Sequence, residues 1–496
     1  MVSGDLRLTL PDLLARRAGE QPTRAALVVA GVGELSFGDW DRRANAVAHA
    51  LLARGLPSGA RVGLLFGERD WIDFAVAWCG VMRAGGVTVP LSDRLAPAEV
   101  AHALTDCSVT AVLHGAGVEP PDAGEWRATP AGLDPGDDGP VGHATPERLA
   151  QIIYTSGTTG RAKGVGATHA NLAHGVSAGP RRRKLAHSQH FLHAFPIGSN
   201  AGQTMLVNAL DACPAALTLP LFTPGRFARL IESYGAGTVF VVPAMAIELL
   251  NARVHERYDL SCVRLLGSTA ASLPPSVATG LAEAFPKAAI VNYYTSTEAA
   301  PAQTVMIVDP DRPASVGRPS AGGDLKIVTA DGGPAAAGEQ GEVWLRCPAG
   351  TRAYYRDRQL SDTVFRDGWV RMGDVGYLDR DGYLYLVDRE SDVIKSGAYK
   401  VSTLQVEAAL YEHPAVAEAA VVGLPHPVLG RVAGAAVVTR YPVAAADLRT
   451  FLLDRLAGHE LPGRLVFLPE LPKNHLGKVV KPRLLDLLER PDAGAV

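Results

Sequence analysis

The chain has 496 residues, too many for one ordinary core, so we expect roughly two to four domains or subdomains. Its net charge of −3 excludes the broad basic surface that a nucleic-acid backbone requires, and no apolar run approaches the roughly 20 residues of a membrane span. The five cysteines are scattered, and the N-terminus has no apolar segment of the kind found in signal peptides. We therefore expect a soluble, cytoplasmic protein.

The first third of the chain alternates helical and strand patterns. Apolar residues recur at helical spacing between Trp40 and Leu52 and predict an amphipathic helix. The elements expected next are a strand at 61–66, a helix at 73–82, a strand at 87–90, a helix at 98–104 with Pro97 in its first turn, and a strand at 110–113. This alternation predicts an α/β fold whose largely parallel sheet is covered on both faces.

The pattern changes twice in the rest of the chain. Residues 115–142 are rich in Pro, Gly and Asp and predict a long surface loop, after which a second α/β stretch follows. Beyond residue 323 short β-segments predominate, with a hairpin turn at Asp381-Gly382. The final elements expected are a helix at 404–411 and a strand at 416–422. We expect a small α+β domain there, with its boundary near Ser391.

The most informative stretch is TSGTTGRAK at residues 155–163. Its glycines permit positive φ and close approach of a ligand, and successive backbone N–H groups in such a turn can bind an anion. The candidate phosphate-binding residues are Thr155, Ser156, Gly157, Thr158, Thr159 and Lys163. The stretch differs from a Walker A loop, because glycine follows Lys163 and strand-like residues come next. We expect a phosphate loop between two strands; a flexible linker is the alternative.

This stretch resembles the signature loop of the adenylate-forming superfamily, which includes acyl-CoA synthetases, adenylation domains of nonribosomal peptide synthetases and beetle luciferases. The resemblance covers nearly the whole chain, and further motifs occur in the family's order. It implies an N-terminal adenylation domain at 1–390, built from two α/β subdomains and a β subdomain. It also implies a small mobile α+β domain at 391–496.

Residues 292–298, NYYTSTE, resemble the family's Tyr-Gly-x-Thr-Glu segment. The match implies that Tyr294 stacks on adenine, that Thr297 bonds the α-phosphate and that Glu298 holds Mg²⁺, which prefers carboxylate oxygen. Thr295 replaces the usual glycine. The neighbouring nucleotide-site candidates are Asn292, Tyr293 and Thr295. Taken alone, the segment could equally be an aromatic strand end.

Other nucleotide contacts follow from the same resemblance. Asp374 matches the aspartate that accepts hydrogen bonds from the ribose, and Arg389 matches an arginine that contacts the ribose or phosphate. A turn at Ser268, Thr269 and Ala270 matches loosely the family's segment beside adenine and the acyl group. Outside this context, Asp374 would be read as an ordinary surface carboxylate.

The C-terminal segment LPKNHLGK resembles the motif that carries the catalytic lysine, which is Lys478 here. Its ammonium would offset the charge that develops between the attacking carboxylate and the α-phosphate. The resemblance places a hinge at Ser391, about which the small domain turns between two half-reactions. Ala398 stands where a second glycine is common in the family, and its methyl group is expected to crowd the thiol tunnel.

The acid itself is less constrained. The expected pocket residues are Gly198, Ser199, Asn200 and Ala299. No Asp or Glu occurs between residues 181 and 210, so an amino acid, whose buried ammonium would lack a partner, is disfavoured. Several small residues around these positions would suit an apolar acid, including a bulky one, although small residues also serve tight packing.

The resemblance thus implies an acid–thiol ligase that uses ATP, Mg²⁺ and coenzyme A to convert a small carboxylic acid into its thioester. One alternative acceptor is the phosphopantetheine of an acyl carrier protein. A second alternative is a nucleotide-binding relative without catalysis, which the presence of Glu298, Asp374 and Lys478 disfavours. A homodimer is left open.

Overall fold

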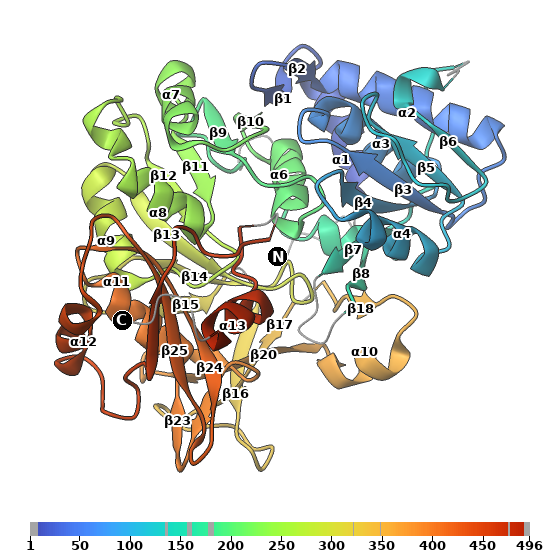
Figure 1. The fold of residues 1–496 in the computed structure, drawn as a ribbon. Coiled ribbons are helices and arrows are strands. Elements are labelled where there is room, and N and C mark those ends of the chain that lie inside the picture. The colour runs from blue at the N-terminus through green and yellow to red at the C-terminus, as the bar shows by residue number, and fades with distance from the viewer. Residues whose placement is uncertain are drawn as a thin grey trace.

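The computed structural model describes residues 8–133, 137–155, 161–176, 183–320, 322–347, 349–474 and 477–490. Within these ranges two large β-sheets with covering helices form an α/β architecture, and a third sheet belongs to a smaller α+β unit that follows (Figure 1). This is the fold class that the sequence predicts. No helix in the described part of the chain is long and apolar enough to cross a membrane.

A seven-stranded sheet holds most of the N-terminal elements, in the order β18-β8-β7-β4-β3-β5-β6. The strands are β3 (Arg61–Phe66), β4 (Val87–Ser92), β5 (Ala111–His114), β6 (Trp126–Ala128), β7 (Leu149–Thr155), β8 (Lys163–Thr168) and β18 (Ala353–Tyr354). The associated helices are α2 (Phe37–Ala53), α3 (Trp71–Arg83) and α4 (Pro97–Asp106). The strands from β7 to β6 run parallel, as the alternating pattern predicts.

The prediction of one long surface loop at 115–142 is wrong in part. Strand β6 lies within it and pairs in parallel with β5, so that Ala111 faces Trp126. A short 3-10 helix at Pro130–Gly132 follows and buries Pro130. The otherwise unpaired edge of β5 explains the difference, because exposed strand N–H and C=O groups favour an added strand even where local composition suggests a loop.

A fourteen-stranded sheet continues through the middle of the described chain. Its strands are β1 (Ala25–Val29), β2 (Gly33–Ser36), β9 (His190–His193), β10 (Ala215–Thr218), β11 (Thr238–Val241), β12 (Leu265–Ser268), β13 (Ala289–Tyr294), β14 (Thr304–Ile307), β15 (Ser315–Pro319), β16 (Asp324–Val328), β17 (Gly341–Arg346), β19 (Phe365–Arg366), β20 (Trp369–Leu378) and β21 (Leu384–Arg389). The β subdomain belongs to this same sheet, because β15 pairs with both β14 and β21.

The helices of this region are α1 (Leu10–Glu20), α5 (His169–Leu172), α6 (Asn200–Asp211), α7 (Pro224–Tyr234), α8 (Pro243–Asn251), α9 (Pro275–Ala284) and α10 (Arg358–Val364).

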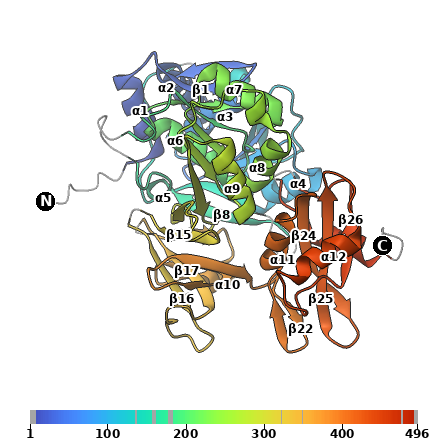
Figure 2. The same ribbon diagram turned by 90° about the vertical axis from the view of Figure 1, so that its left-hand side faces the viewer.

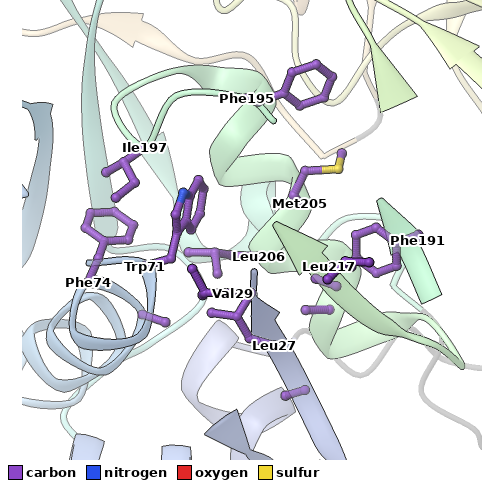
Figure 3. Close-up of a cluster of buried hydrophobic side chains, with 14 of the residues drawn as sticks. Leu27, Val29, Trp71, Phe74, Phe191, Phe195, Ile197, Met205, Leu206 and Leu217 are labelled. Carbon is purple, nitrogen blue, oxygen red and sulfur yellow. The ribbon is translucent and has the colours of Figure 1, made fainter. Parts of the chain in front are cut away.

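One large core joins the two α/β units. In Figure 3, Trp71 and Phe74 of α3 lie beside Leu206 of α6 and Val29 of β1. This shared core holds the two sheets in a fixed relative arrangement.

The C-terminal unit has a five-stranded sheet of its own. Its elements are β22 (Ile394–Ser396), β23 (Tyr399–Val401), α11 (Thr403–Tyr411), β24 (Val416–His426), β25 (Gly430–Thr439), α12 (Ala445–Leu453), β26 (Arg464–Phe467) and α13 (Lys481–Glu489). Figures 1 and 2 both place α11 against α9. The chain passes from the large sheet to this small one between Arg389 and Ile394, and Ser391 lies in that connection.

Candidate active site

The predicted phosphate loop joins two antiparallel strands. Thr155 ends β7 and faces Lys163 at the start of β8, so the stretch connects strand to strand and no Walker-type helix follows. Ser156, Gly157, Thr158 and Thr159 lie outside the described residues. The two ends of the loop are thereby held at one edge of the seven-stranded sheet, next to β18.

Strand β18 brings this edge to Glu298. Its Tyr354 pairs with Val165 of β8, and the Tyr354 hydroxyl donates to Glu298 Oε1 at 3.0 Å. The ammonium of Lys163 lies 5.8 Å from the centroid of the Tyr354 ring. Burial and then the charge of Glu298 raise the pKa of Tyr354, which keeps its hydroxyl a donor. The loop and the predicted metal-holding carboxylate are therefore neighbours.

A buried arginine also holds the segment that contains Glu298. Arg352 is 5% exposed, and its Nη1 donates to the Thr297 carbonyl and to Asn200 Oδ1, both at 2.9 Å. Its Nε donates to Asn171 Oδ1 at 3.0 Å. Burial lowers the pKa of Arg352 to about 10, while Glu298 opposes the shift, so the side chain stays cationic at neutral pH. Three separate segments are tied to Thr297 in this way.

The sequence analysis missed both Arg352 and Tyr354. Tyr354 is on a two-residue strand and Arg352 comes just before it, and so short an element gives no periodic signal. The adjacent tyrosines at 354 and 355 were the only local cue.

The predicted ribose residues lie together at the other end of the site. Asp374 of β20 faces Arg389 of β21 across the ladder, and Arg389 Nε lies 3.5 Å from Asp374 Oδ1. The Tyr294 hydroxyl donates to Asp374 Oδ2 at 2.5 Å, which fixes the orientation of the predicted adenine-stacking ring. Burial raises the pKa of Asp374 although Arg389 opposes it. Three residues predicted separately are therefore joined by one hydrogen bond and one ion pair.

The ends of β12 and β13 carry unpaired polar atoms. Ser268 and Asn292 face each other across these parallel strands, and Ser268 Oγ and Asn292 Oδ1 are buried without a hydrogen-bond partner among the described residues. Unsatisfied buried polar atoms are rare in native proteins and point to a missing partner such as a ligand group. Thr269 donates its N–H to the Val241 carbonyl at 3.1 Å, and Ala270 follows with a φ of 76°.

Tyr293 lies on the same strand and packs towards Phe240, with ring centroids 6.4 Å apart. A Cβ added to Gly267 would lie 2.8 Å from an atom of the Phe240 ring and 2.9 Å from an atom of the Tyr293 ring. Only glycine therefore allows both rings to pack against the backbone here. Thr295 comes two residues later, and its hydroxyl donates to the Ala302 carbonyl at 2.7 Å. The threonine that replaces the family's glycine is thus anchored to backbone.

The predicted acyl-pocket residues have structural partners. Ser199 caps α6, since its Oγ accepts from Gly202 N at 2.9 Å. Asn200 holds Arg352, as described above. A Cβ added to Gly198 would lie 3.1 Å from the Ser92 nitrogen, so the backbone approaches closely here. Ala299 is buried with Leu345, Cys347 and Val370. Whether these four positions contact an acid stays a prediction.

A carboxylate does lie beside this pocket segment, although it comes from a distant part of the chain. Glu68 follows β3, and its two oxygens accept from Ile197 N at 3.3 and 3.2 Å. The Ser92 hydroxyl donates to Glu68 Oε1 at 3.0 Å. Burial raises the pKa of Glu68 to about 7. The sequence analysis missed it because residues 181–210 alone were searched for acids.

Lys478 of the C-terminal unit lies within electrostatic range of both ends of the site. Burial, and then the charge of Arg389, lower its pKa, whereas Glu298 and Asp374 act in the opposite sense. The residue as a whole is nevertheless exposed to solvent. Its N–H donates to Asn474 Oδ1 at 3.0 Å, and the preceding Gly477 has a φ of 75°. The lysine predicted from the sequence is therefore within electrostatic reach of Glu298 and Asp374.

Comparison with known families agrees with this geometry. A model described as AMP-binding enzyme matches residues 14–355, and one described as AMP-binding enzyme C-terminal domain matches residues 405–478. The chain belongs to the AMP-binding enzyme family. The resemblance expected from the sequence is confirmed.

Relatives of this AMP-binding enzyme align over nearly their whole lengths. A feruloyl-CoA synthase of Amycolatopsis sp is 32% identical over 483 residues, covering 94% of this chain and 96% of the relative. A 2-succinylbenzoate–CoA ligase of Bacillus velezensis is 29% identical over 491 residues, covering 96% and 98%. The enzyme class predicted from the sequence, an AMP-forming acyl-CoA ligase, is confirmed at this level.

Solved structures agree as well. ATP-bound MatB from Rhodopseudomonas palustris superposes with a TM-score of 0.84 at 26% identity, covering 97% of this chain and 99% of that one. An anthranilate CoA ligase in complex with anthranoyl-AMP gives 0.86 at 23% identity, covering 97% of both chains, and shows the shared fold. Lys163, Glu298 and Tyr354 fall within the first region matched by the family models, and Lys478 is the last residue of the second.

Proposed function

We propose that this AMP-binding enzyme activates an apolar, aromatic carboxylic acid as its acyl-adenylate at the site between Lys163 and Lys478, and then transfers the acyl group to coenzyme A. One observation carries the assignment of the site. Glu298 is tied to the phosphate-loop edge through Tyr354, while the charges of Glu298, Asp374 and Arg389 all act on Lys478.

In the first half-reaction a carboxylate oxygen of the acid attacks the α-phosphorus of ATP. A new O–P bond forms, the bond to the bridging oxygen breaks, and pyrophosphate leaves with the electron pair. Lys478 would offset the negative charge on the attacking and α-phosphoryl oxygens. Asp374 would accept from the ribose, with Arg389 beside it, and Thr155 and Lys163 would border the departing phosphates. Positioning and charge neutralisation supply most of the acceleration in such reactions.

The residues present suit a magnesium ion. Glu298 offers a half-buried carboxylate held by Tyr354, and the described residues contain no group of three or more His, Cys, Asp or Glu that could cage a metal. Mg²⁺ commonly binds through one or two carboxylates, with substrate phosphates and waters as its remaining ligands. Bound there by Glu298, it would supply charge neutralisation on the phosphates.

In the second half-reaction a thiolate attacks the acyl carbonyl, a C–S bond forms, and AMP leaves with the electron pair of the broken C–O bond. Coenzyme A is the proposed acceptor, supported by relatives whose names specify CoA thioesters. Ser391 is the proposed hinge for the turn between the two steps, at the change of sheet near 390–393. Domain limits of 1–390 and 391–496 follow from the same proposal.

Two features support an apolar aromatic acid. The rings of Phe240 and Tyr293 lie at the carboxyl ends of β11 and β13, the strands on either side of β12, where ligands commonly bind in such sheets. The nearby Glu68 has both oxygens engaged, which leaves it a poor partner for a substrate ammonium. The feruloyl and 2-succinylbenzoate relatives are named for acids that contain an aromatic ring.

A panel of acids tests the proposal. Pyrophosphate release is measured with ATP, MgCl₂ and ferulic, 2-succinylbenzoic, oxalic, sulfoacetic, long-chain fatty or polycyclic acid. We expect release with an aryl acid, and mass spectrometry should then identify its CoA thioester. Release with oxalic or sulfoacetic acid alone would contradict the apolar pocket. Acylation of a phosphopantetheinylated carrier protein in place of CoA would contradict the acceptor.

A further inference from the structure

The connection between the two units is bridged by a buried carboxylate. Asp388, the next-to-last residue of β21 in the large sheet, is 2% exposed. Its Oδ1 accepts from the Thr403 hydroxyl at 3.1 Å, and its Oδ2 accepts from the Thr403 N–H. Thr403 is the first residue of α11 in the C-terminal unit. Both oxygens of one carboxylate therefore hold a single residue on the far side of the connection at 390–393.

Two neighbouring contacts extend this bridge. The Ser402 hydroxyl donates to the Val387 carbonyl at 2.5 Å, which fixes the start of α11 against the same strand. The ammonium of Lys481 donates to Asp392 Oδ2 at 2.7 Å and to Thr403 Oγ1 at 3.3 Å. The Thr403 hydroxyl thus joins Asp388 to Lys481, which begins α13 only three residues after Lys478.

The next residue of β21 belongs to the nucleotide end of the site. Arg389 reaches Asp374, while Asp388 reaches α11, because successive side chains of a strand point to opposite faces. The end of this strand is therefore common to the proposed ribose site and to the anchor of the C-terminal unit.

We propose that Asp388 is a positioning residue for adenylation: its carboxylate fixes α11 and, through Thr403 and Lys481, the segment that presents Lys478 to the nucleotide. This inference rests on the proposed function. A displacement of about 1 Å between reacting groups can slow a reaction on the order of a hundredfold, so a contact that orients the lysine segment affects the rate without touching substrate.

The chemistry of the contact suits this task. A buried carboxylate that accepts two hydrogen bonds from one residue restricts both its position and its orientation. Burial raises the pKa of Asp388, whereas Thr403 and the charge of Lys481 favour the ionised form. The charge of the same Lys481 also acts on the half-buried Glu407 of α11, and its ammonium pairs with Asp392. The ammonium of Lys481 therefore stabilises carboxylates on both sides of the connection at 390–393.

Separate assays of the two half-reactions test the inference. Pyrophosphate release is measured with the most active acid of the panel, and thiolysis is measured by supplying its purified acyl-adenylate with CoA. For Asp388→Ala and Thr403→Val we expect adenylation to fall about tenfold or more, the usual effect of losing a hydrogen bond to a charged group, while thiolysis changes less than about threefold. Asp388→Asn, which keeps an acceptor for the Thr403 N–H, should recover part of the adenylation rate.

The matched control is Asp447→Asn, which changes an exposed carboxylate in the first turn of α12 in the same unit and should leave both rates unchanged. Equal losses in both half-reactions with a lowered melting temperature would show a structural role only and overturn the inference. Unchanged adenylation in Thr403→Val, the milder variant, would overturn it as well. Wild-type protein that releases no pyrophosphate with any acid would refute the proposed function itself, a result separable from these.

Discussion

At the scale of single residues, Glu68 shows how a buried acid couples ionisation to structure. Its carboxylate holds the Ile197 N–H and the Ser92 hydroxyl, and so connects the ends of two sheets beside the proposed acyl pocket. Burial raises its pKa from 4.5 to about 7. The folded protein therefore keeps a proton on Glu68 over a range in which the unfolded chain has already lost it.

This difference predicts a pH-dependent stability. Because the folded-state pKa is raised, the free energy of unfolding falls as pH rises from about 4.5 through about 7. Glu68→Gln removes this titration and should gain about 1–3 kcal/mol relative to wild type between pH 5 and pH 8. Urea unfolding followed by tryptophan fluorescence at a series of pH values measures it. Parallel pH profiles for the two proteins would contradict the assignment.

Lys478 is the residue on which the first half-reaction is expected to depend. Lys478→Ala should reduce pyrophosphate release by about two orders of magnitude or more, while thiolysis of supplied acyl-adenylate persists. Because burial and Arg389 lower its pKa, the alkaline loss of adenylation in wild type should begin below the ordinary lysine value of 10.5. Lys287→Ala, a change at another exposed lysine, is the control. Near-normal pyrophosphate release by Lys478→Ala would refute this role.

At the scale of elements, the two-residue strand β18 has an effect out of proportion to its length. Pairing with β8 carries Tyr354 to Glu298, and the residue just before the strand, Arg352, reaches the Thr297 carbonyl. A buried cation is tolerated there because three acceptors and the nearby Glu298 compensate for its lost hydration. The strand therefore positions the predicted metal-holding segment from outside it.

Removing the cation should affect both folding and chemistry. Arg352→Met leaves the Thr297 carbonyl and two asparagine oxygens without their donor, and we expect a loss of about 3 kcal/mol in stability together with strongly reduced adenylation. Arg352→Lys keeps the charge but cannot span all three partners, so it should rescue only partly. Arg356→Ala, an exposed change four residues on, is the control. Thermal unfolding measures the loss of stability, and pyrophosphate assays of the variants that still fold measure the loss of activity. A stable and fully active Arg352→Met would show that Arg352 does not hold the Thr297 segment in place.

At the scale of the whole molecule, the orientation of the C-terminal unit decides whether the site is complete. Arg440 Nε donates to Asn251 Oδ1 of α8 at 2.9 Å across the interface. Lys473 pairs with Glu418 of β24 at 2.6 Å, and its charge also opposes the effect of burial that raises the pKa of Glu248 on α8. One lysine thus lies between carboxylates of the two units and favours their docked arrangement.

Charge reversal tests this docking. Lys473→Glu places a third carboxylate near Glu418 and Glu248, so we expect a larger radius of gyration in small-angle scattering and about tenfold slower adenylation. The double change Lys473→Glu with Glu248→Lys should restore part of both. Lys395→Glu alters an exposed lysine of the same unit and serves as the control. An unchanged radius and rate for Lys473→Glu would show that these charges do not hold the units together.

The sequence predicted the strongly periodic elements well, but it did not predict contacts between residues that are distant in the chain. Strong periodic segments were predicted closely: the strand expected at 61–66 is β3, and the helix expected at 404–411 differs from α11 by one residue. The predicted nucleotide residues Tyr294, Asp374 and Arg389 are in contact. Strand β6 was missed because partner availability outweighed its loop-like composition. Glu68, Arg352 and Asp388 were missed because each acts on residues far away in the chain.

The sequence by itself determined the family, the order of the motifs and the class of reaction, because phosphate, ribose and carboxylate chemistry require particular residue types that recur in a recognisable order. Only the tertiary structure decided which side chains support them. Tyr354 reaches Glu298 across 56 residues and Ile197 reaches Glu68 across 129. Such contacts depend on how sheets and units pack, and a hydrogen bond between distant residues leaves no periodic trace in either local segment.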